Sequence, residues 1–280
     1  MLSMVACSQD GTTTSQSSTG ETESQESSQT SSSEDTSSEE SSNTQATGKL
    51  ADIKNKGELV VGVEATFPPF ESFDPENGTE IIGFDIDVMN EVAKDLGVTL
   101  VVKDMEFSGI VPSVQTGKID LAPGITPTED RKEMVDFSQE YCASKLGLVI
   151  REDDDSIQTL DDLQGKVISA QLGSLADKQL TAVLGATPKT YNKHDEALLA
   201  VKNGTIDGHV LDGSVGNTYA DSMGGLKVIE IPEFNEGLDG LACIVAKGET
   251  DLLDAVNSTI TRLQESGEMD ELMDKWHIFK

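Results

Sequence analysis

The chain has 280 residues, with 51 acidic against 20 basic side chains and a formal net charge of −31. Nucleic acids and anionic membrane surfaces bind to basic patches, so this charge argues against both as partners. The sequence contains no run of 18 or more apolar residues, and none of it is therefore expected to span a bilayer. The three histidines stand at no metal-ligand spacing from one another or from a cysteine, so we expect neither a metal nor another cofactor.

The first fifty residues differ in composition from the rest. Between Gly11 and Thr47 the only hydrophobic residue is Ala46. Such a segment has no apolar surface to offset the entropy of ordering, so residues 1–49 are expected to form a disordered, Ser/Thr/Glu-rich tether. They hold eight acids and one lysine, whereas residues 50–280 hold 43 acids and 19 bases. The body of the protein is therefore acidic in its own right.

The segment 1–7 places Ala6 before Cys7, with apolar residues just upstream. This arrangement resembles the end of a bacterial lipoprotein signal, and the resemblance implies that Cys7 is acylated. The alternative is an ordinary cysteine in the tail. The basic segment and the longer apolar stretch of such a signal do not precede Cys7, so we expect the natural chain to start earlier.

From residue 58 the sequence alternates between strand-like and helix-like patterns. In chain order we expect a strand at 58–63, a helix at 83–96 ended by Gly97, a strand at 98–102, a helix at 110–115, strands at 119–124 and 166–171, a helix at 196–202, a strand at 206–212 and a long amphipathic helix around 252–263. Alternating strands and helices predict an α/β fold, in which helices cover both faces of a parallel sheet.

A short internal repeat supports two such units. Residues 116–121 (TGKIDL) and 203–208 (NGTIDG) each close a helix with glycine and start a strand. The similarity extends over only six residues and is also compatible with chance. If it is real, the chain has two α/β lobes of similar build, and the cleft between such lobes is where small ligands bind.

Three clusters of chemistry-bearing residues follow predicted strands, where open α/β sheets bind ligands. In the first, Glu64 and Phe67 follow the strand at 58–63. The alternative interpretation is a surface acid beside a core phenylalanine. In the second, Gly124, Thr126 and Arg131 offer an approachable backbone, a hydroxyl and a fork for a carboxylate. Here the alternative is a helix start with Arg131 paired to a neighbouring acid.

The third cluster joins Gln171 and Ser174 with Asp212, at the ends of two strands of the second unit. Asp212 is in the position of a helix N-cap, which is the commoner use of an aspartate there, and it could also hold an ammonium group. Arg131 for a carboxylate and Asp212 for an ammonium together match the main-chain part of a free α-amino acid.

The order of motifs strengthens this interpretation. The segments that carry it are 83–93 (GFDIDVMNEVA), 107–112 (FSGIVP), 124–131 (GITPTEDR), 135–138 (VDFS) and 275–276 (KW). In these segments the chain resembles the polar amino-acid-binding proteins of ABC importers, the bacterial extracellular solute-binding proteins of family 3. The stretch 64–70 (EATFPPF) resembles the arginine- and lysine-type receptors among them. The resemblance extends from about Leu59 to Trp276.

The resemblance implies a periplasmic-binding-protein type II-like fold, in which two α/β lobes are joined by two crossover strands and close on the ligand like a hinge. Lobe 1 is expected to consist of residues 50–143 and 239–280, and lobe 2 of residues 144–238. Cys142 lies at the expected hinge and Cys243 in a strand returning to lobe 1. They could form a disulfide in an exported protein, or remain buried free thiols.

The resemblance also implies a role for each candidate. Arg131 binds the ligand carboxylate with Thr126 and the backbone near Ser174. Asp212 binds the α-ammonium with Thr126 and the Gly124 backbone. The side-chain end of the ligand is expected to meet Phe67, Phe107, Glu64 and Gln171. A carboxylate between two aromatic rings suits a cationic side chain through charge-assisted and cation–π contacts.

We therefore expect a receptor for arginine or lysine that passes its ligand to an ABC permease. A glutamine or broad polar amino-acid receptor is the first alternative, and a dehydratase-type enzyme on the same fold is the second. The receptor hypothesis requires no catalytic residue. It predicts a monomer outside the cytoplasmic membrane, in the periplasm or anchored to the membrane only by a lipid on Cys7.

Overall fold

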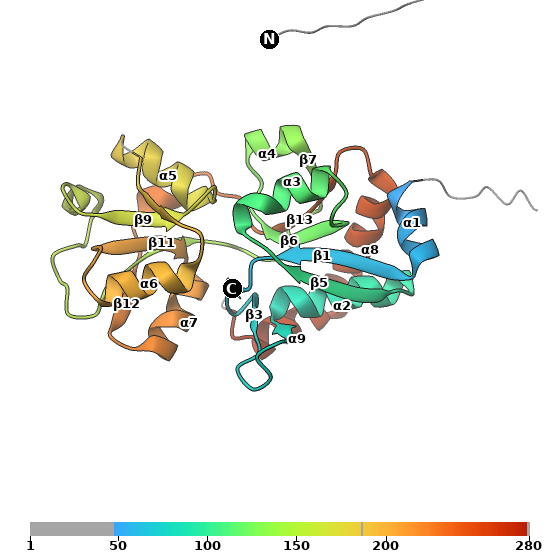
Figure 1. Cartoon of the computed structure of the whole chain (residues 1–280), viewed down its shortest axis with the longest axis horizontal. Coiled ribbons are helices and arrows are strands. Elements are labelled where there is room, and N and C mark those ends of the chain that lie inside the picture. The colour runs from blue at the N-terminus through green and yellow to red at the C-terminus, as the bar shows by residue number, and fades with distance from the viewer. Residues whose placement is uncertain (1–47, 186, 279–280) are drawn as a thin grey trace, which may run out of the picture. The chain divides into compact units, whose positions relative to one another are not determined.

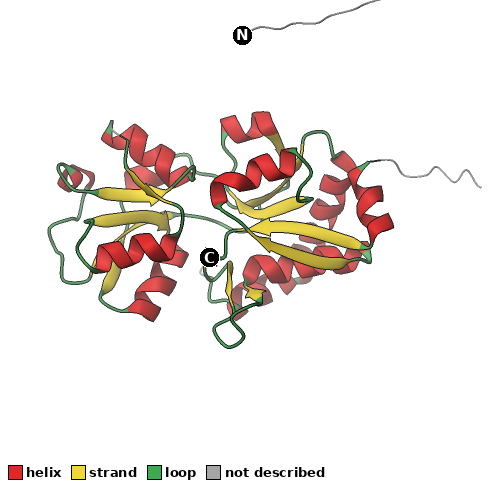
Figure 2. Ribbon diagram, viewed as in Figure 1, coloured by secondary structure: helices red, strands yellow, loops and turns green. Residues whose placement is uncertain are grey.

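A computed structural model describes residues 48–185 and 187–278 of the chain. Cys7 and all but the last two residues of the expected tether lie outside the described residues. Within these two ranges, no helix is both long and apolar enough to cross a membrane. The described body begins with a helix at Lys49 and contains two five-stranded sheets (Figures 1 and 2).

The first sheet follows the order β5-β1-β6-β13-β7. Its strands are β5 (Thr99–Asp104), β1 (Glu58–Val63), β6 (Leu121–Ile125), β13 (Ala242–Ala246) and β7 (Val135–Phe137). The helices packed on or beside it are α1 (Lys49–Lys56), α2 (Phe84–Leu96), α3 (Ile110–Gln115), α4 (Glu129–Met134), α8 (Thr250–Ser266) and α9 (Glu268–Lys275). A 3₁₀ turn, η1 (Phe107–Gly109), precedes α3.

The alternation of side chains in β1 explains why this sheet is covered on both faces. Leu59 and Val61 pack with the apolar faces of α2 and α8, whereas Val60 packs with α3. All three are almost fully buried. Because successive residues of a strand point to opposite faces, an uninterrupted apolar run such as that in β1 requires a helical layer on each side.

The second sheet follows the order β10-β9-β11-β8-β12. Its strands are β10 (Lys189–Tyr191), β9 (Ile168–Gln171), β11 (Gly208–Asp212), β8 (Leu146–Arg151) and β12 (Leu226–Ile229). The helices packed on it are α5 (Leu175–Leu184), α6 (His194–Lys202) and α7 (Gly213–Met223). The remaining elements are η2 (Leu160–Leu163), η3 (Pro232–Asn235) and a small sheet of β2 (Thr66–Phe67), β3 (Glu71–Phe73) and β4 (Ile81–Ile82).

Neither large sheet is purely parallel, so that part of the expectation was wrong. In the first sheet β13 runs antiparallel to both β6 and β7, and in the second β8 runs antiparallel to both β11 and β12. The reason is the path of the chain, which passes from one sheet to the other after β7 and returns before β13. A strand that follows such a crossing enters its sheet in the reverse direction.

The two crossing segments pair with each other. The Tyr141 N–H donates to the Leu241 carbonyl at 2.9 Å, and the Leu241 N–H donates to the Cys142 carbonyl at 2.7 Å. A Cβ at Gly240 would lie 2.5 Å from that same Cys142 carbonyl oxygen, so this approach of the two backbones depends on glycine. Cys142 and Cys243 are both buried free thiols.

The repeat detected in the sequence is also a structural repeat. Asp120 accepts the N–H of Val60 in β1 at 2.8 Å, and Asp207 accepts the N–H of Val167, just before β9, at 2.7 Å. Each aspartate directly precedes a strand, β6 in one sheet and β11 in the other. The same short unit therefore fastens together two neighbouring parallel strands in both halves of the fold.

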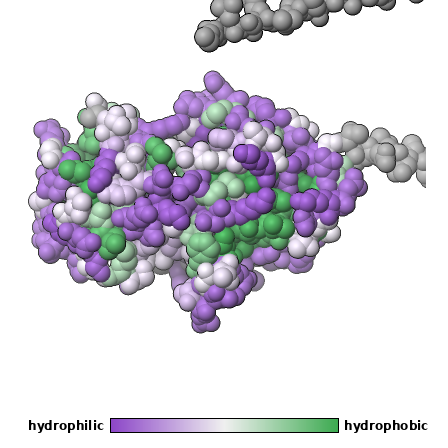
Figure 3. All heavy atoms as spheres, in the orientation of Figure 1, coloured by the Kyte–Doolittle hydropathy of each residue, from purple (hydrophilic) through white to green (hydrophobic). Residues whose placement is uncertain are grey.

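The surface of the described part is mainly hydrophilic on the face shown in Figure 3. This agrees with the acidic composition of residues 50–280. Many of these acids form exposed ion pairs, such as Lys178 with Asp130 at 2.7 Å and Lys227 with Asp155 at 2.8 Å. Exposed pairs of this kind contribute little to stability.

Candidate functional site

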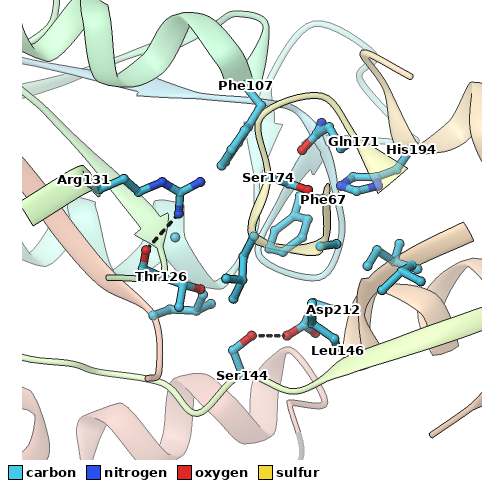
Figure 4. Close-up of a pocket in the computed structure, with 16 residues that line it drawn as sticks. Phe67, Phe107, Thr126, Arg131, Ser144, Leu146, Gln171, Ser174, His194 and Asp212 are labelled. Atoms are coloured by element: carbon cyan, nitrogen blue, oxygen red, sulfur yellow. Dashed lines mark hydrogen bonds between the residues drawn. The ribbon is translucent and has the colours of Figure 1, made fainter. Parts of the chain in front are cut away.

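A pocket lies between the two large sheets and is lined by residues of both (Figure 4). Its empty volume is about 470 Å³, including the part that opens to solvent. Eight of the nine predicted ligand-binding residues line it, and these are Phe67, Phe107, Gly124, Thr126, Arg131, Gln171, Ser174 and Asp212. Glu64 lines a smaller neighbouring cavity that shares Phe67, Phe107, Gly124 and Gln171 with the pocket.

Arg131 is a buried cation that forms no ion pair with an acid of the described residues. It is the third residue of α4, whose N-cap is Thr128, and only 5% of the residue is exposed. Its guanidinium donates to two carbonyls, Thr126 at 2.8 Å and Gly173 at 3.2 Å, and no carboxylate of the described residues forms a salt bridge with it. Burial lowers the pKa of Arg131 to about 10. A bound anion would supply the missing countercharge.

The N-terminus of α5 faces the same pocket as Arg131. Ser174 is the N-cap of this helix, and its side chain accepts from the Asp177 N–H. Leu175 and Ala176, the first residues of the helix, line the pocket. N–H groups in the first turn of a helix have no partner within the helix, and the helix dipole favours an anion there. A carboxylate placed at Arg131 would therefore also meet this helix end.

Asp212 ends β11 and is at once the N-cap of α7 and a pocket residue. One oxygen accepts from the Ser214 N–H at 2.8 Å and the Val215 N–H at 3.4 Å, and the other accepts from the Ser144 hydroxyl at 2.8 Å. Burial raises the pKa of Asp212, while these donors act in the opposite direction. The interpretation of Asp212 as a helix N-cap is thus correct. The same hydrogen bonds hold its carboxylate in a fixed position at the pocket wall.

Glu64 follows β1 and lies almost fully buried beside Gln171 of the opposite sheet. Its carboxylate accepts from the Thr66 hydroxyl at 2.7 and 2.9 Å and from the Gln171 amide at 3.0 Å. Burial nevertheless raises the pKa of Glu64 to about 7. The described residues provide no cationic side chain in contact with this carboxylate, which makes it a candidate partner for a cation.

The aromatic rings and the glycine shape the space between these charged groups. Phe67 and Phe107 line both the pocket and the smaller cavity, and the Arg131 guanidinium lies 5.4 Å from the Phe107 ring centroid. The N–H of Gly124 already donates to the Tyr141 hydroxyl at 2.7 Å. Only the Gly124 carbonyl therefore remains for a ligand, and it can accept from an ammonium.

Two further acids lie behind Gly124 and were not predicted from the sequence. Glu71 and Asp85 are both buried, and a hydrogen bond joins their two carboxyls, so one of the two must carry a proton. Burial and their mutual proximity raise the pKa of Glu71 well above its usual range, and burial also raises that of Asp85. A Cβ at Gly124 would lie 2.7 Å from Asp85. Glu71 lines the smaller cavity next to Glu64.

Direct contacts hold the two sheets' loops together around the pocket. Thr66 accepts the His194 N–H at 3.2 Å on its hydroxyl and the Tyr219 hydroxyl at 3.0 Å on its carbonyl. The bonds from Arg131 to Gly173 and from Gln171 to Glu64 cross in the same way. These contacts enclose the pocket, as expected of the closed state of a hinge-type receptor.

Some lining residues had no signal in the sequence. Ser144 comes from the crossing segment, and His194 begins α6 after β10, where no motif marks it. The helix start at Leu175 and Ala176 could have been found from Ser174, because a serine three residues before an aspartate is a capping pattern. The roles of all these residues, and of the nine predicted ones, remain predictions. Cys7 lies outside the described residues.

Comparisons with known proteins agree with this geometry. Residues 59–279 match the family "Bacterial extracellular solute-binding proteins, family 3". The arginine-binding extracellular protein ArtP of Bacillus subtilis (strain 168) is 30% identical over 225 residues, which cover 79% of this chain and 86% of ArtP.

Two solved structures are also similar. The amino-acid ABC transporter substrate-binding protein AbpA from Streptococcus pneumoniae Canada MDR_19A, bound to L-arginine, is 32% identical with a TM-score of 0.76, covering 82% of this chain and 99% of that one. An ancestral arginine-binding protein bound to glutamine is 36% identical with a TM-score of 0.72, covering 79% and 97%. The chain belongs to the bacterial extracellular solute-binding proteins of family 3.

Proposed function

We propose that this chain is the substrate-binding protein of an ABC amino-acid importer. It binds a free α-amino acid with a cationic side chain, arginine or lysine, closes around it and delivers it to the permease in the membrane. Lobe 1 consists of residues 50–143 and 239–280, and lobe 2 of residues 144–238. The resemblance to ArtP and to AbpA with L-arginine supports this choice of ligand.

One observation carries the proposal. Arg131, a buried guanidinium without an ion pair among the described residues, shares a pocket with the buried carboxylate of Asp212. A ligand with an anion and a cation on neighbouring atoms, as in the main chain of a free amino acid, would pair with both at once. Pairing a buried charge removes most of the penalty of its burial, so such a ligand gains affinity from both ends.

The side-chain end of the ligand is assigned to Glu64. A chain that leaves the Asp212 end and passes between Phe67 and Phe107 reaches the smaller cavity, which Glu64 lines. A carboxylate in a buried, partly aromatic site favours a guanidinium or ammonium group and repels a second carboxylate. Glutamate and aspartate are therefore poor ligands.

Glutamine is the second candidate, and two observations favour it. The pKa of Glu64 is about 7, so a neutral carboxyl coexists with the carboxylate near neutral pH. In addition, one similar structure is an ancestral arginine-binding protein with glutamine bound. A glutamine side chain could donate its amide N–H to Glu64 without needing a charge there.

The remaining parts of the proposal concern the setting. The chain works as a monomer on the outer side of the cytoplasmic membrane or in the periplasm, with a lipid on Cys7 as the only membrane anchor. It releases its ligand unchanged. Its relatives ArtP and AbpA are named as binding proteins, AbpA as that of an amino-acid ABC transporter. The receptor role uses the pocket residues for hydrogen bonds and ion pairs without a general acid or base.

Isothermal titration with arginine, lysine, glutamine and glutamate tests the ligand. We expect 1:1 binding of arginine or lysine, weaker binding of glutamine and none of glutamate. NMR spectra of the ligand after prolonged incubation are expected to show no product. Binding of glutamate in preference to arginine, or of no amino acid, would contradict the proposal. Mass spectrometry of ligand released from natively purified protein gives an independent identification.

A further inference from the structure

A chain of three buried side chains in the second lobe ends at the ligand pocket. The Ser169 hydroxyl in β9 lies 2.8 Å from His209 Nδ1 in β11, and His209 Nε2 lies 2.9 Å from His194 Nδ1 at the start of α6. Ser169 and His209 are fully buried and His194 is 3% exposed. His194 lines the pocket, whereas the other two do not.

The hydrogen-bond partners determine where the protons of this chain lie. The Ser169 hydroxyl donates to the Gly208 carbonyl at 3.2 Å, because a carbonyl oxygen can only accept. That hydroxyl has a single proton, so in the bond to His209 it must accept, and His209 carries its proton on Nδ1. His209 Nε2 is then an acceptor, and His194 must donate from its own Nδ1. The proton on His194 Nδ1 leaves Nε2 with a lone pair.

No described residue donates a hydrogen bond to this Nε2 lone pair of His194, whose ring is bonded only through Nδ1. The ring lies 5.7 Å from the ring of Phe67, between centroids, on the side of the pocket where Figure 4 shows Gln171. This is the Glu64 side, because Gln171 donates directly to the Glu64 carboxylate. Burial lowers the pKa of His194 to about 3, so the ring stays neutral and does not repel a cation.

We propose that His194 Nε2 accepts a hydrogen bond from an N–H group on the ligand's side chain, and that Ser169 and His209 are positioning residues that keep this nitrogen unprotonated. The proposal rests on the proposed function and specifies its side-chain site. Glu64 and His194 then supply two hydrogen-bond acceptors and no positive charge. A guanidinium, with N–H groups along several edges, can serve both, whereas a carboxylate side chain would meet lone pairs on each.

Two substitutions of His194 separate hydrogen bonding from packing. His194→Phe keeps an aromatic ring against Phe67 and removes the acceptor, and we expect it to weaken arginine binding by about tenfold to a hundredfold. His194→Gln can donate to His209 and accept from the ligand, and we expect its affinity to stay within about threefold of the wild type. Equal affinity of the wild type and His194→Phe would overturn the proposal. So would equally large losses in both variants.

The proton positions can be measured without any ligand. Long-range ¹H–¹⁵N spectra of the ligand-free wild type are expected to show both His194 and His209 protonated on Nδ1 alone. Ser169→Ala removes the hydroxyl acceptor but keeps the Ser169 backbone, which also bonds the His209 ring, and is expected to raise the share of the other tautomer. A proton on His194 Nε2 in the wild type would overturn the inference, and an unchanged spectrum in Ser169→Ala would remove Ser169 from it. Because these spectra require no amino acid, they distinguish a wrong tautomer from a wrong proposed function.

Discussion

The two lobes are built from the same unit but treat their buried charges differently. In lobe 1, the buried groups around the pocket lack a counterion among the described residues, and these groups are Glu64, Glu71, Asp85 and Arg131. In lobe 2, Asp212 is held by three donors, and the chain from Ser169 to His194 is neutral and internally bonded. Lobe 1 thus carries most of the buried charges that lack a counterion among the described residues, whereas lobe 2 contributes one such carboxylate, Asp212, and a neutral hydrogen-bonded chain.

The repeated aspartates show that this difference does not arise from the scaffold. Asp120 and Asp207 fasten a neighbouring strand in the same way in both sheets. The two lobes differ in the loops that follow the strands. Binding residues in these loops can change without altering the sheets and the helices that cover them. A charged side chain that is buried without a counterion lowers the free energy of unfolding. A ligand that supplies the opposite charge gains binding free energy from the same site. The predictions below test this division between the lobes.

Arg131→Met is expected to give the largest effect. Methionine fills similar space without charge, so the variant should lose about 2–5 kcal/mol of arginine-binding free energy, the range for truncating one partner of a buried charge pair. The ligand-free protein should become more stable, because an unpaired guanidinium is no longer buried. Titration calorimetry measures the first effect and thermal unfolding without ligand the second.

Lys132→Ala is the matched control for this change. Lys132 lies on the same helix with an exposed ion pair to Glu129 at 3.1 Å, so neither affinity nor stability should change appreciably. Unchanged affinity in Arg131→Met would remove Arg131 from the site. Reduced stability of the ligand-free variant would instead show that the two carbonyl contacts of Arg131 outweigh its unpaired charge.

Asp212→Asn tests the buried carboxylate of lobe 2. Asparagine can still cap α7, so the free energy of unfolding should stay within about 1 kcal/mol of the wild type. Loss of the negative charge should nevertheless reduce arginine binding by about 2 kcal/mol or more. Asp195→Asn, an exposed acid in the first turn of α6, is the control. If Asp212→Asn binds as the wild type does, Asp212 serves the helix alone.

The pH dependence of binding tests Glu64. Its pKa is about 7 without ligand, and a cationic side chain favours the ionised form, so the pKa must fall when arginine binds. Affinity should therefore decrease as the pH falls below about 7, by up to about tenfold per pH unit until the pKa of the complex is reached. Calorimetric titrations at about pH 5.5, 7 and 8.5 measure this slope.

Glu64→Gln is the variant that sharpens this measurement. It removes the titrating group, so the pH slope should disappear, and arginine binding at high pH should weaken by about 1.5–3 kcal/mol, the range for a hydrogen bond to a charged group. Glutamine binding should change less, because an amide can replace the carboxyl as acceptor. The same slope in variant and wild type would assign the titration to another residue.

Much of the fold could be predicted from the sequence, because local patterns record it. The patterns at 58–63, 206–212 and 83–96 predicted two strands and a helix that the structure contains, and the predicted family and fold are confirmed. The reversed strands β8 and β13 were not predictable from the same patterns. Strand direction depends on where the chain crosses between sheets, and hydrophobic periodicity carries no information on that path.

The site was predictable where a residue followed a strand in a recognisable motif. Arg131 and Asp212 met that condition, and both line the pocket. His194 did not, because its pocket position depends on a contact with His209, fifteen residues away, and on burial that no local pattern encodes. The same holds for Glu71, whose neighbour Asp85 belongs to a different element. Buried polar pairs of this kind become visible only in three dimensions.

The smallest expected effect concerns the Glu71 and Asp85 pair and the stability of lobe 1. Burial beside Asp85 raises the folded-state pKa of Glu71 well above its unfolded value of about 4.3. The folded state therefore binds the proton more tightly, and stability declines as the pH rises from the unfolded towards the folded pKa, with a slope of up to about 1.4 kcal/mol per pH unit. Glu71→Gln mimics the protonated acid and should flatten this decline.

Thermal or denaturant unfolding of the ligand-free protein between about pH 5 and 8 measures that slope. Glu76→Gln, an exposed acid in the loop between β3 and β4, is the control and should leave the slope unchanged. A slope of the same size in Glu71→Gln would place the proton elsewhere, and Glu64 and Asp85, whose pKa values burial also raises, would then be the groups to test. A smaller slope in Glu71→Gln would show that Glu71 holds a proton in folded lobe 1, at a buried site without a counterion among the described residues.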